Sequence, residues 1–253
     1  MTALSSWTEG EHTADDLTGR TLRFPTWRKG TGPGVIVIHE MPGLIPEVID
    51  FGEEVVAAGF TVVMPSLFGR PGAPASLAET VRASRQVCVR KEFVTLATGR
   101  TSPVVGWLRS LARELHAELG GPGVGALGMC FTGGFALAMM VDEAVAAPVL
   151  CQPSVPFPVG RRRAGDVNLS PADLSVVRER AAGGCRVLGL QYAEDPVTGT
   201  RFDTLDRELG EAFLRIDFEG KGHSTVTADR QQRGVDRVLS FFSEVLDPDR
   251  PIS

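Results

Sequence analysis

Long, uninterrupted apolar runs are missing from this chain. A helix needs about 20 such residues to cross the hydrocarbon core of a bilayer, so no membrane-spanning segment is expected. Residues 1–30 are polar and lack the apolar core of a secretory signal peptide. Together these absences predict a cytoplasmic protein that has no membrane partner.

An excess of positive charge is also missing. The 253 residues include 26 Lys and Arg against 31 Asp and Glu, which gives a net charge of −5. Nucleic-acid-binding domains normally present a basic face, so no nucleic-acid partner is expected. Residues 161–163 form one compact run of three arginines. This run is too short to indicate a polyanion site, and we interpret it as part of a solvated loop.

Cysteine is scarce and widely spaced, at Cys88, Cys130, Cys151 and Cys185. These positions form no Cys-x-x-Cys pair and no zinc-knuckle spacing, so no metal site is predicted. An even number of cysteines is compatible with disulfides. Without an export signal, free thiols in a reducing compartment are the preferred interpretation.

Strand-like and helix-like segments alternate along the chain. Residues 35–39 are a β-branched run bounded by turns, which predicts a buried central strand. A helix over residues 47–59 and a strand over residues 60–64 follow. Strand–helix–strand order implies a parallel sheet with helices on its faces. The pattern continues to an amphipathic helix over residues 229–246.

The length fits a single α/β domain that spans residues 1–253. We expect an N-terminal arm over residues 1–20, an edge strand over residues 21–27 and an irregular excursion over residues 153–184. Further helices are expected over residues 76–98, 102–119, 135–140, 173–182 and 200–210, and further strands over residues 124–127, 144–151, 186–192 and 212–218.

Residues 124–140 have the composition of a nucleophile elbow. An apolar strand leads into a turn crowded with small residues, and a helix follows. In this layout a sharp turn exposes one reactive side chain, and the N-terminus of the helix favours an anion beside it. Here the residue at the apex is Cys130. Taken alone, Cys130 could also be a small core residue, so the interpretation requires a base and an acid elsewhere in the chain.

Three further polar residues follow predicted strands: Glu40, Asp195 and His223. Ligands of doubly wound sheets bind beyond the carboxyl ends of the strands, where these residues are expected. The order cysteine, aspartate, histidine is that of nucleophile, acid and base in α/β-hydrolases. Individually, His223 could be an exposed loop histidine, Asp195 a turn former before Pro196 and Glu40 a surface charge. Their joint occurrence at strand ends favours a site.

From about residue 21 to residue 246 the sequence resembles the dienelactone hydrolase family of α/β-hydrolases. The likeness is carried by His-Glu-Met-Pro-Gly at residues 39–43, by residues 128–134, by Asp195 and by Gly-His-Ser at residues 222–224. It implies an α/β-hydrolase fold, with a mostly parallel central sheet and helices on both faces.

The resemblance also implies roles for four residues. Cys130 is the expected nucleophile, His223 the base and Asp195 the acid that orients it. Glu40 is expected to interact with the thiol and to help control its ionisation. Two positions depart from the family pattern. Thr132 stands where the usual elbow has glycine, and this larger residue is expected to strain the turn. Thr227 stands where the family prototype has an arginine for the substrate carboxylate, which argues against dienelactone itself as the substrate.

The expected reaction is hydrolysis of a small-molecule carboxylic ester or lactone by a Cys130 thiolate. The backbone N–H groups of Met41 and Phe131 would form the oxyanion hole. Arg90 lies near the position of another substrate arginine of the family and is expected to bind a substrate carboxylate, although an exposed helix arginine is an equally good interpretation. No metal and no cofactor are expected.

Two alternatives remain open. Because a scaffold does not determine its substrate, the chain could be a broad-specificity carboxylesterase or thioesterase on the same fold. In another class, it could be a non-catalytic redox-sensing or ligand-binding protein that keeps Cys130 as a responsive thiol. No oligomeric state is predicted.

Overall fold

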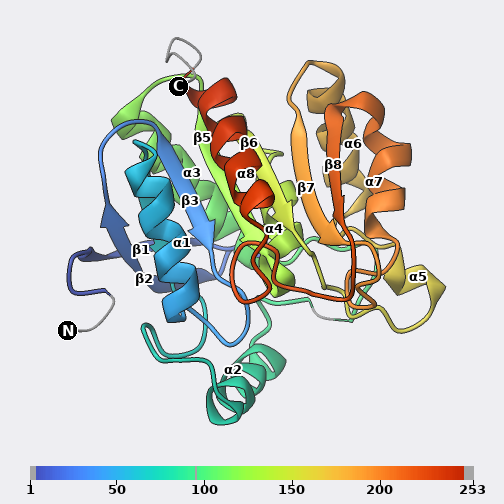
Figure 1. Cartoon of the computed structure of the whole chain (residues 1–253), viewed down its shortest axis with the longest axis horizontal. Helices are drawn as coiled ribbons and strands as arrows, with labels where there is room; N and C mark the ends of the chain where they lie inside the picture. Colours follow the sequence, from blue (N-terminus) through green and yellow to red (C-terminus); the bar gives the residue numbers. More distant parts are fainter. Residues whose placement is uncertain (1–3, 95, 248–253) are drawn as a thin grey trace.

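One mixed β-sheet forms the middle layer of the computed structural model, which describes residues 4–94 and 96–247 (Figure 1). Along the chain its strands are β1 (Thr8–Asp15), β2 (Thr21–Lys29), β3 (Gly34–Ile38), β4 (Thr61–Pro65), β5 (Val124–Met129), β6 (Val145–Cys151), β7 (Val187–Tyr192) and β8 (Phe213–Phe218). Across the sheet the order is β1-β2-β4-β3-β5-β6-β7-β8. The β1–β2 and β2–β4 pairs are antiparallel and the other pairs are parallel, which confirms the predicted fold class.

The N-terminal segment differs from the prediction. Residues 8–15, expected to lie in an arm, form β1 and pair with β2 from Asp15 opposite Thr21 to Thr8 opposite Arg28. The strand over residues 21–29 is therefore the second strand and not the edge. Most β1 side chains are exposed and only His12 is buried. An exposed edge strand has no apolar alternation, so no strand was predicted over these residues.

The helices are α1 (Pro46–Ala57), α2 (Leu77–Val89), α3 (Val104–Leu119), α4 (Gly133–Met139), α5 (Arg161–Ala164), α6 (Pro171–Ala182), α7 (Arg201–Leu209) and α8 (Gln232–Leu246). The helix expected over residues 76–98 ends at Val89. The arginine run, expected in a loop, forms the one-turn helix α5. Ser102, just before α3, does not cap it with its side chain: its oxygen accepts the Val94 N–H, and its hydroxyl donates to Asn168 Oδ1. Among the described residues, none of these helices has both the length and the apolar character needed to cross a bilayer.

Alternate residues of the central strands supply two apolar layers. Val35 and Val37 of β3 pack with α1 and α8 on one face. Ile36 and Ile38 pack with α3 and α4 on the other face, where α6 and α7 also lie. Since both faces are covered, all five residues of β3 are buried, as predicted for a central strand.

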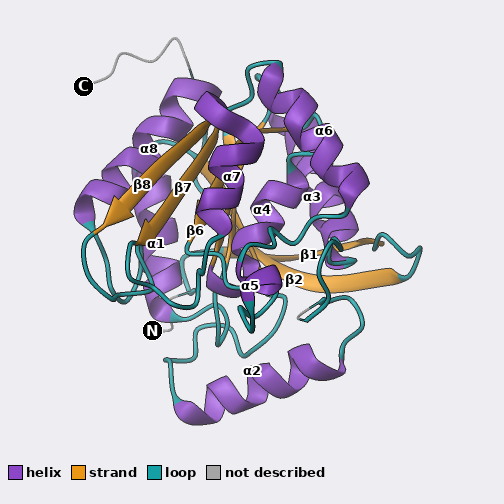
Figure 2. Cartoon of the chain, turned by 90° about the vertical axis from the view of Figure 1, so that its right-hand side faces the viewer, coloured by secondary structure: helices purple, strands orange, loops and turns teal. Residues whose placement is uncertain are grey.

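The carboxyl ends of the parallel strands meet at one edge of the sheet, at the bottom of Figure 1. The loops after β3, β5, β6, β7 and β8 gather there. Figure 2 shows α5 close to this edge and α2 beyond it, joined to the rest of the domain by extended loops. Every candidate residue that follows a strand therefore lies at the same side of the molecule.

Gly128, near the end of β5, provides a test of the turn between β5 and α4. A Cβ at this position would lie 2.2 Å from the Thr132 carbonyl oxygen. We expect Gly128→Ala to lower the free energy of unfolding by about 3 kcal/mol, because backbone must move to relieve the clash. Urea denaturation measures the change.

Gly183→Ala is the matched control, because a Cβ there would meet its nearest atoms at 3.4 and 3.5 Å. Its stability is expected to stay within about 0.5 kcal/mol of the wild type. Equal stability of the two variants would contradict a tightly packed elbow.

Candidate active site

Cys130 lies at the apex of a sharp turn between β5 and α4. Its backbone has a φ of 51°, in the left-handed region that non-glycine residues rarely adopt. Residues 130–132 form a single 3₁₀ turn, and α4 begins at once with Gly133. A Cβ on Gly133 would approach the Cα of Pro153 to 2.7 Å, so the small residues of the motif make room for neighbouring backbone. The side chain of Cys130 is half-buried.

Thr132 stabilises the turn and is not itself strained. Its φ of −97° is ordinary, so the unusual backbone is at Cys130. The Thr132 hydroxyl lies 3.0 Å from the Ile38 carbonyl oxygen, and it accepts a hydrogen bond from the Met129 N–H at 3.1 Å. The expected strain at this larger residue is therefore absent, and its hydroxyl joins the elbow to the end of β3.

His223 and Asp195 form a hydrogen-bonded pair across the loops that follow β8 and β7. His223 Nδ1 lies 2.8 Å from Asp195 Oδ2. Asp195 also accepts hydrogen bonds from the Thr198 hydroxyl at 2.6 Å and from the Val197 N–H at 2.9 Å. The side chain of Asp195 is 1% exposed and that of His223 is 26% exposed, so the pair is largely shielded from solvent.

The electrostatics favour the charged form of both partners. Burial lowers the pKa of His223, but hydrogen bonds and charges from Asp195 and Cys130 outweigh it and raise that pKa to about 10. Burial raises the pKa of Asp195, but the hydrogen bonds from His223, Thr198 and Val197 leave it below its ordinary value. The site is therefore arranged to stabilise an imidazolium ion between a carboxylate and the Cys130 sulfur.

Glu40 is a buried carboxyl group that links the end of β3 to the histidine loop. Its side chain accepts hydrogen bonds from the hydroxyls of Ser224, at 2.9 Å, and Thr227. Burial raises its pKa, and these two hydrogen bonds act in the opposite direction. The interaction of Glu40 with the thiol remains a prediction. Thr227, at the position of the family arginine, instead serves as a donor to Glu40.

His39, beside Glu40, shapes the loops around the site. Its ring donates from Nδ1 to the Glu40 carbonyl at 3.0 Å and accepts the Leu67 N–H at Nε2, also at 3.0 Å. Complete burial lowers its pKa to about 4, so the ring stays neutral and can accept that bond. His39 therefore positions the peptide before Met41.

The two expected oxyanion donors follow the ends of adjacent strands. Met41 follows β3 and Phe131 follows β5, and these strands pair in parallel with Ile38 opposite Gly128. Phe131 is 1% exposed and packs edge-on against Phe93, with their ring centroids 5.7 Å apart. The peptides before Met41 and Phe131 thus lie at the same edge of the sheet as Cys130.

Ser154 contacts the candidate nucleophile and was not predicted. Its hydroxyl oxygen lies 3.4 Å from Cys130 Sγ, and its N–H donates to the Cys130 carbonyl at 2.9 Å. The side chain is buried, with 1% exposed. Its position just after β6, the strand beside β5, could have indicated that it lies near Cys130. The irregular Pro-rich composition of residues 153–184 obscured that place.

Gln152 and Arg201 were also missed, and both hold loops of the site. Gln152 Oε1 accepts hydrogen bonds from the N–H and the hydroxyl of Thr225, at 3.2 and 2.7 Å. Arg201 is 1% exposed and donates to the Thr198 carbonyl at 2.5 Å and to the Pro156 carbonyl. It thereby joins the loop of Asp195 to the excursion after β6. No sequence signal distinguishes a buried arginine of this kind from an exposed helix residue.

Arg90 directly follows α2 and contacts the loop after β4. Its Nη1 donates to the Leu67 carbonyl at 3.1 Å, its Nε lies 3.8 Å from Glu92, and its guanidinium lies 5.7 Å from the ring centroid of Phe24. A role in binding a substrate carboxylate remains a prediction. In the described part of the chain, no group of three or more His, Cys, Asp or Glu side chains could hold a metal ion.

Comparisons with known proteins identify the family and the fold. A profile of the dienelactone hydrolase family matches residues 21–161, more than half of the chain. No curated protein sequence matches it. Dienelactone hydrolase from Anabaena variabilis superposes with a TM-score of 0.62 at 16% identity, over 94% of this chain and 99% of that one.

Two further solved structures have the same fold. A cold-adapted esterase from an Arctic intertidal metagenomic library superposes with a TM-score of 0.61 at 16% identity, over 96% of both chains. A dienelactone hydrolase-like promiscuous phosphotriesterase from metagenomic libraries gives a TM-score of 0.62 at 16% identity, over 94% of this chain and 99% of that chain.

The His223–Asp195 pair leads to a prediction about proton affinity. Asp195→Asn is expected to lower the pKa of His223 by roughly 2 units, because an amide cannot compensate the imidazolium charge. NMR titration of the labelled ring measures it. Asp236→Asn is the control, since Asp236 lies on α8 and contacts Gln232. An unshifted His223 pKa in Asp195→Asn would contradict the ion pair.

The same pair predicts how stability depends on pH. The folded-state pKa of His223 is raised from 6.5 to about 10. Its interaction therefore stabilises the fold fully below about pH 6.5, and the contribution disappears as the pH rises through 10. Since Asp195 must also be ionised, the difference in unfolding free energy between wild type and Asp195→Asn should be greatest near pH 5–6. A constant difference from pH 5 to pH 10 would count against the assignment.

Ser154→Ala tests the contact with the sulfur. Loss of the hydroxyl beside the Cys130 sulfur is expected to slow alkylation of Cys130 by iodoacetamide about tenfold at neutral pH. Peptide mass spectrometry separates Cys130 from the exposed Cys88. Ser240→Ala removes a hydroxyl that contacts Glu244 on α8 and should leave the rate unchanged. Identical rates in the two variants would show that Ser154 does not act on the sulfur.

Proposed function

Because the chain belongs to the dienelactone hydrolase family of the α/β-hydrolase superfamily, we propose that it hydrolyses carboxylic esters or lactones with Cys130 as the nucleophile. The observation that carries the proposal is the 2.8 Å hydrogen bond between His223 Nδ1 and Asp195, at the same edge of the sheet as Cys130 with its strained backbone. A cysteine at a strained apex, a histidine and a buried carboxylate are the three groups that acyl transfer requires.

In the first half of the reaction, the Cys130 thiolate attacks the carbonyl carbon and the carbonyl electrons move to oxygen. The N–H groups of Met41 and Phe131 bind this oxyanion; loss of one such donor typically lowers the rate by about 10²–10³. When the intermediate collapses, the bond to the leaving oxygen breaks and His223 gives that alkoxide its proton. The product is a thioester on Cys130 and a free alcohol; in a lactone the alcohol stays attached.

In the second half, water replaces the alcohol. His223, now neutral, takes a proton from water as the water attacks the thioester carbonyl. The tetrahedral intermediate then expels the Cys130 thiolate, which is again paired with the protonated histidine. Asp195 binds Nδ1 of the ring at 2.8 Å, which leaves Nε2 to exchange protons with the alcohol and the water.

Glu40 and Arg90 have supporting roles in the proposal. Glu40 positions the histidine loop through Ser224 and Thr227 and assists ionisation of the thiol. Arg90 is one candidate for binding a carboxylate on those substrates that carry one, since it could exchange its bond to the Leu67 carbonyl for the substrate. The esterase and phosphotriesterase neighbours make neutral esters appropriate first substrates.

Cys130→Ala tests the nucleophile. We expect hydrolysis of p-nitrophenyl butyrate to fall at least about 10³-fold, because no other group can form the acyl intermediate. The exposed Cys88 provides the control, and Cys88→Ala is expected to keep wild-type turnover. Circular dichroism and the urea midpoint establish that both variants fold. Retained turnover by folded Cys130→Ala would refute the assignment, and a wild type that oxidises at Cys130 without hydrolysing any ester would favour a redox-sensing role.

A further inference from the structure

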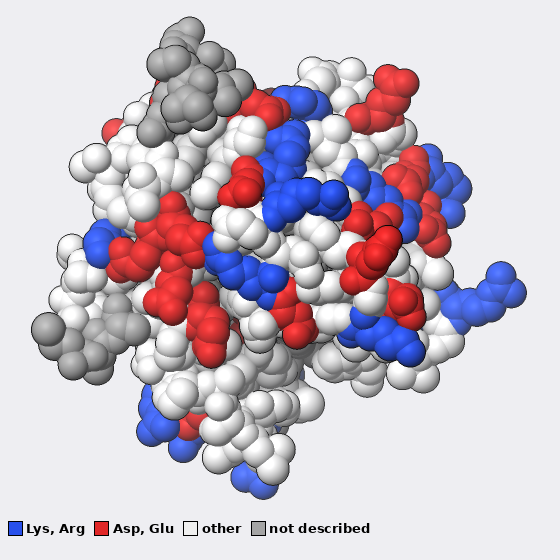
Figure 3. Space-filling model, viewed as in Figure 1, with Lys and Arg blue, Asp and Glu red and all other residues white. Residues whose placement is uncertain are grey.

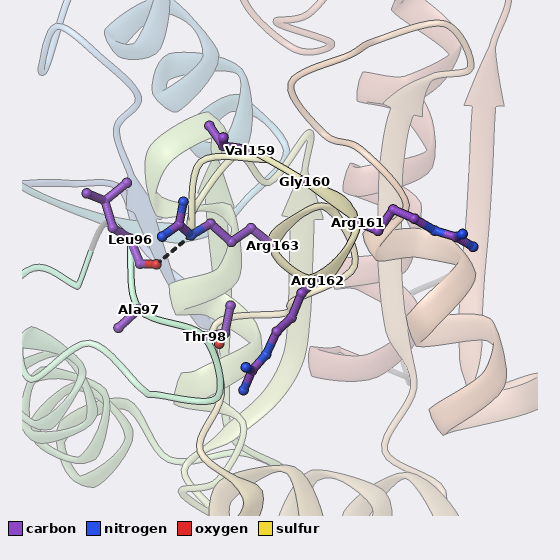
Figure 4. Close-up of a pocket in the computed structure, with 8 residues that line it drawn as sticks. All are labelled: Leu96, Ala97, Thr98, Val159, Gly160, Arg161, Arg162 and Arg163. Carbon is purple, nitrogen blue, oxygen red and sulfur yellow. Dashed lines mark hydrogen bonds between the residues drawn. The ribbon is translucent and has the colours of Figure 1, made fainter.

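A cavity of about 560 Å³ opens between two loops near the carboxyl edge of the sheet (Figure 4). Residues 96–98 form one side and residues 159–163 the other. The second side includes all three arginines of the run in α5, and neither side contributes an acidic residue. The run that the sequence suggested to be a solvated loop therefore lines a cavity.

The arginines of this cavity have free hydrogen-bond donors. Arg163 donates from Nε to the Leu96 carbonyl at 2.9 Å, a bond that directs its guanidinium across the cavity. Arg162 extends on the side of Thr98 in Figure 4. Within residues 4–94 and 96–247, Arg162 has no hydrogen bond or ion pair with another side chain, and the terminal nitrogens of Arg163 have none either.

Many other arginines of the surface are paired with an acid. Positive and negative side chains are interspersed on the face drawn in Figure 3. Arg28 pairs with Glu118 at 2.7 Å and Arg230 with Glu54 at 2.6 Å. In a chain with a net charge of −5, acidic partners are plentiful. Two arginines directed at a cavity without acids are therefore a local excess of positive charge, which attracts anions.

The wall of the cavity is fixed to the candidate active site. The buried guanidinium of Arg201 donates to the carbonyls of Pro156 and of Arg163, the latter at 3.2 Å. The same group donates to the Thr198 carbonyl, in the loop of Asp195. One buried side chain thus joins the cavity wall to the loop that orients His223.

Chain geometry also limits the distance between the cavity and Cys130. Val159 is five residues after Ser154, and an extended chain spans at most about 18 Å over five residues. Leu96 is three residues after Phe93, whose ring packs against Phe131, and three residues span at most about 11 Å. An extended substrate held at Cys130 can therefore reach the cavity with its far end.

We propose that this cavity is a subsite for an oxyanion group, carboxylate or phosphate, on the substrate, and that Arg162 and Arg163 bind it. The planar guanidinium presents paired N–H donors that match two oxygens of either group. This inference rests on the proposed ester hydrolysis and adds the substrate class: esters with an acidic group distant from the scissile bond. It places the acid at α5, whereas binding by Arg90 would place it at the end of α2.

A kinetic experiment compares p-nitrophenyl hemiglutarate, which is anionic, with its neutral methyl ester. For the wild type, kcat/KM should be higher for the anionic substrate, and 0.5 M NaCl should reduce the difference because salt screens it. Arg162→Ala should lower the anionic-to-neutral ratio of kcat/KM about tenfold, the value of one charge-assisted contact. Arg23→Ala removes a surface arginine of β2 and should leave the ratio unchanged.

Three kinetic results would overturn the proposal: no anionic preference in the wild type, an unchanged ratio in Arg162→Ala, or an equal loss in Arg23→Ala. A loss of preference in Arg90→Ala with none in Arg162→Ala would also overturn it, in favour of the site at α2.

A binding experiment separates this inference from the proposed reaction. Glutarate and inorganic phosphate are titrated into full-length Cys130→Ala and followed by NMR of the arginine side chains. Shifts at Arg162 and Arg163 with either probe support the subsite, and the stronger probe identifies the oxyanion. No shift with either probe overturns it. If these shifts occur but the wild type hydrolyses no ester, the proposed reaction fails and the anion site stands.

Discussion

The hydrogen bond between His223 and Asp195 is the interaction on which the site depends. The two residues belong to loops after adjacent strands, β8 and β7, and their bond is 2.8 Å long. Loops at a sheet edge are mobile unless other contacts order them. Here two side chains from other loops bind the histidine loop: Glu40 accepts from Ser224 and Thr227, and Gln152 accepts from Thr225. The ends of β3 and β6 thus hold the imidazole in place.

These contacts require polar groups in the interior, where an unpaired polar group costs about 1–3 kcal/mol. Glu40 meets the requirement with two hydroxyl donors, and Asp195 with a hydroxyl, a backbone N–H and the imidazole. Arg201 has no carboxylate within ion-pair distance among the described residues and is surrounded by backbone carbonyls. Burial lowers its pKa to about 10, which still leaves it charged at neutral pH. Its charge lies near Asp195, whose ionised form it favours.

The sequence could predict the parts that depend on composition and order. The β-branched run at residues 35–39 indicated a central strand, and β3 is buried throughout. The glycines around Cys130 indicated a turn with little space, and Gly128 lies against the Thr132 carbonyl. By contrast, β1 has exposed side chains and is held by backbone pairing with β2, which depends on no particular side chain. Such a strand has no alternation of apolar and polar residues from which it could be predicted.

The contacts of individual side chains were harder to predict, because they join residues far apart in the chain. Ser154 meets Cys130 only because β6 lies beside β5 and the chain turns back after it. Thr227 is 187 positions from Glu40, the carboxyl group to which it donates. Thr132 looked too large for its place in the elbow, but its hydroxyl reaches the end of β3. In each case the fold supplied a partner that local sequence could not indicate.

The replacement of the family arginine by Thr227 changes the charge of the site. An arginine at this position could pair with Glu40 and present a positive charge beside Cys130. With Thr227 as donor, Glu40 is held by hydroxyls alone, and its burial favours the neutral acid. Without an arginine at position 227, the cationic groups beside the site are the protonated ring of His223 and the buried guanidinium of Arg201. Neither has a free face for a substrate carboxylate: one is committed to Asp195 and Cys130, and the other to backbone carbonyls. In the proposed reaction, a substrate that carries an acid would therefore place it farther from the scissile bond, where exposed arginines can reach it.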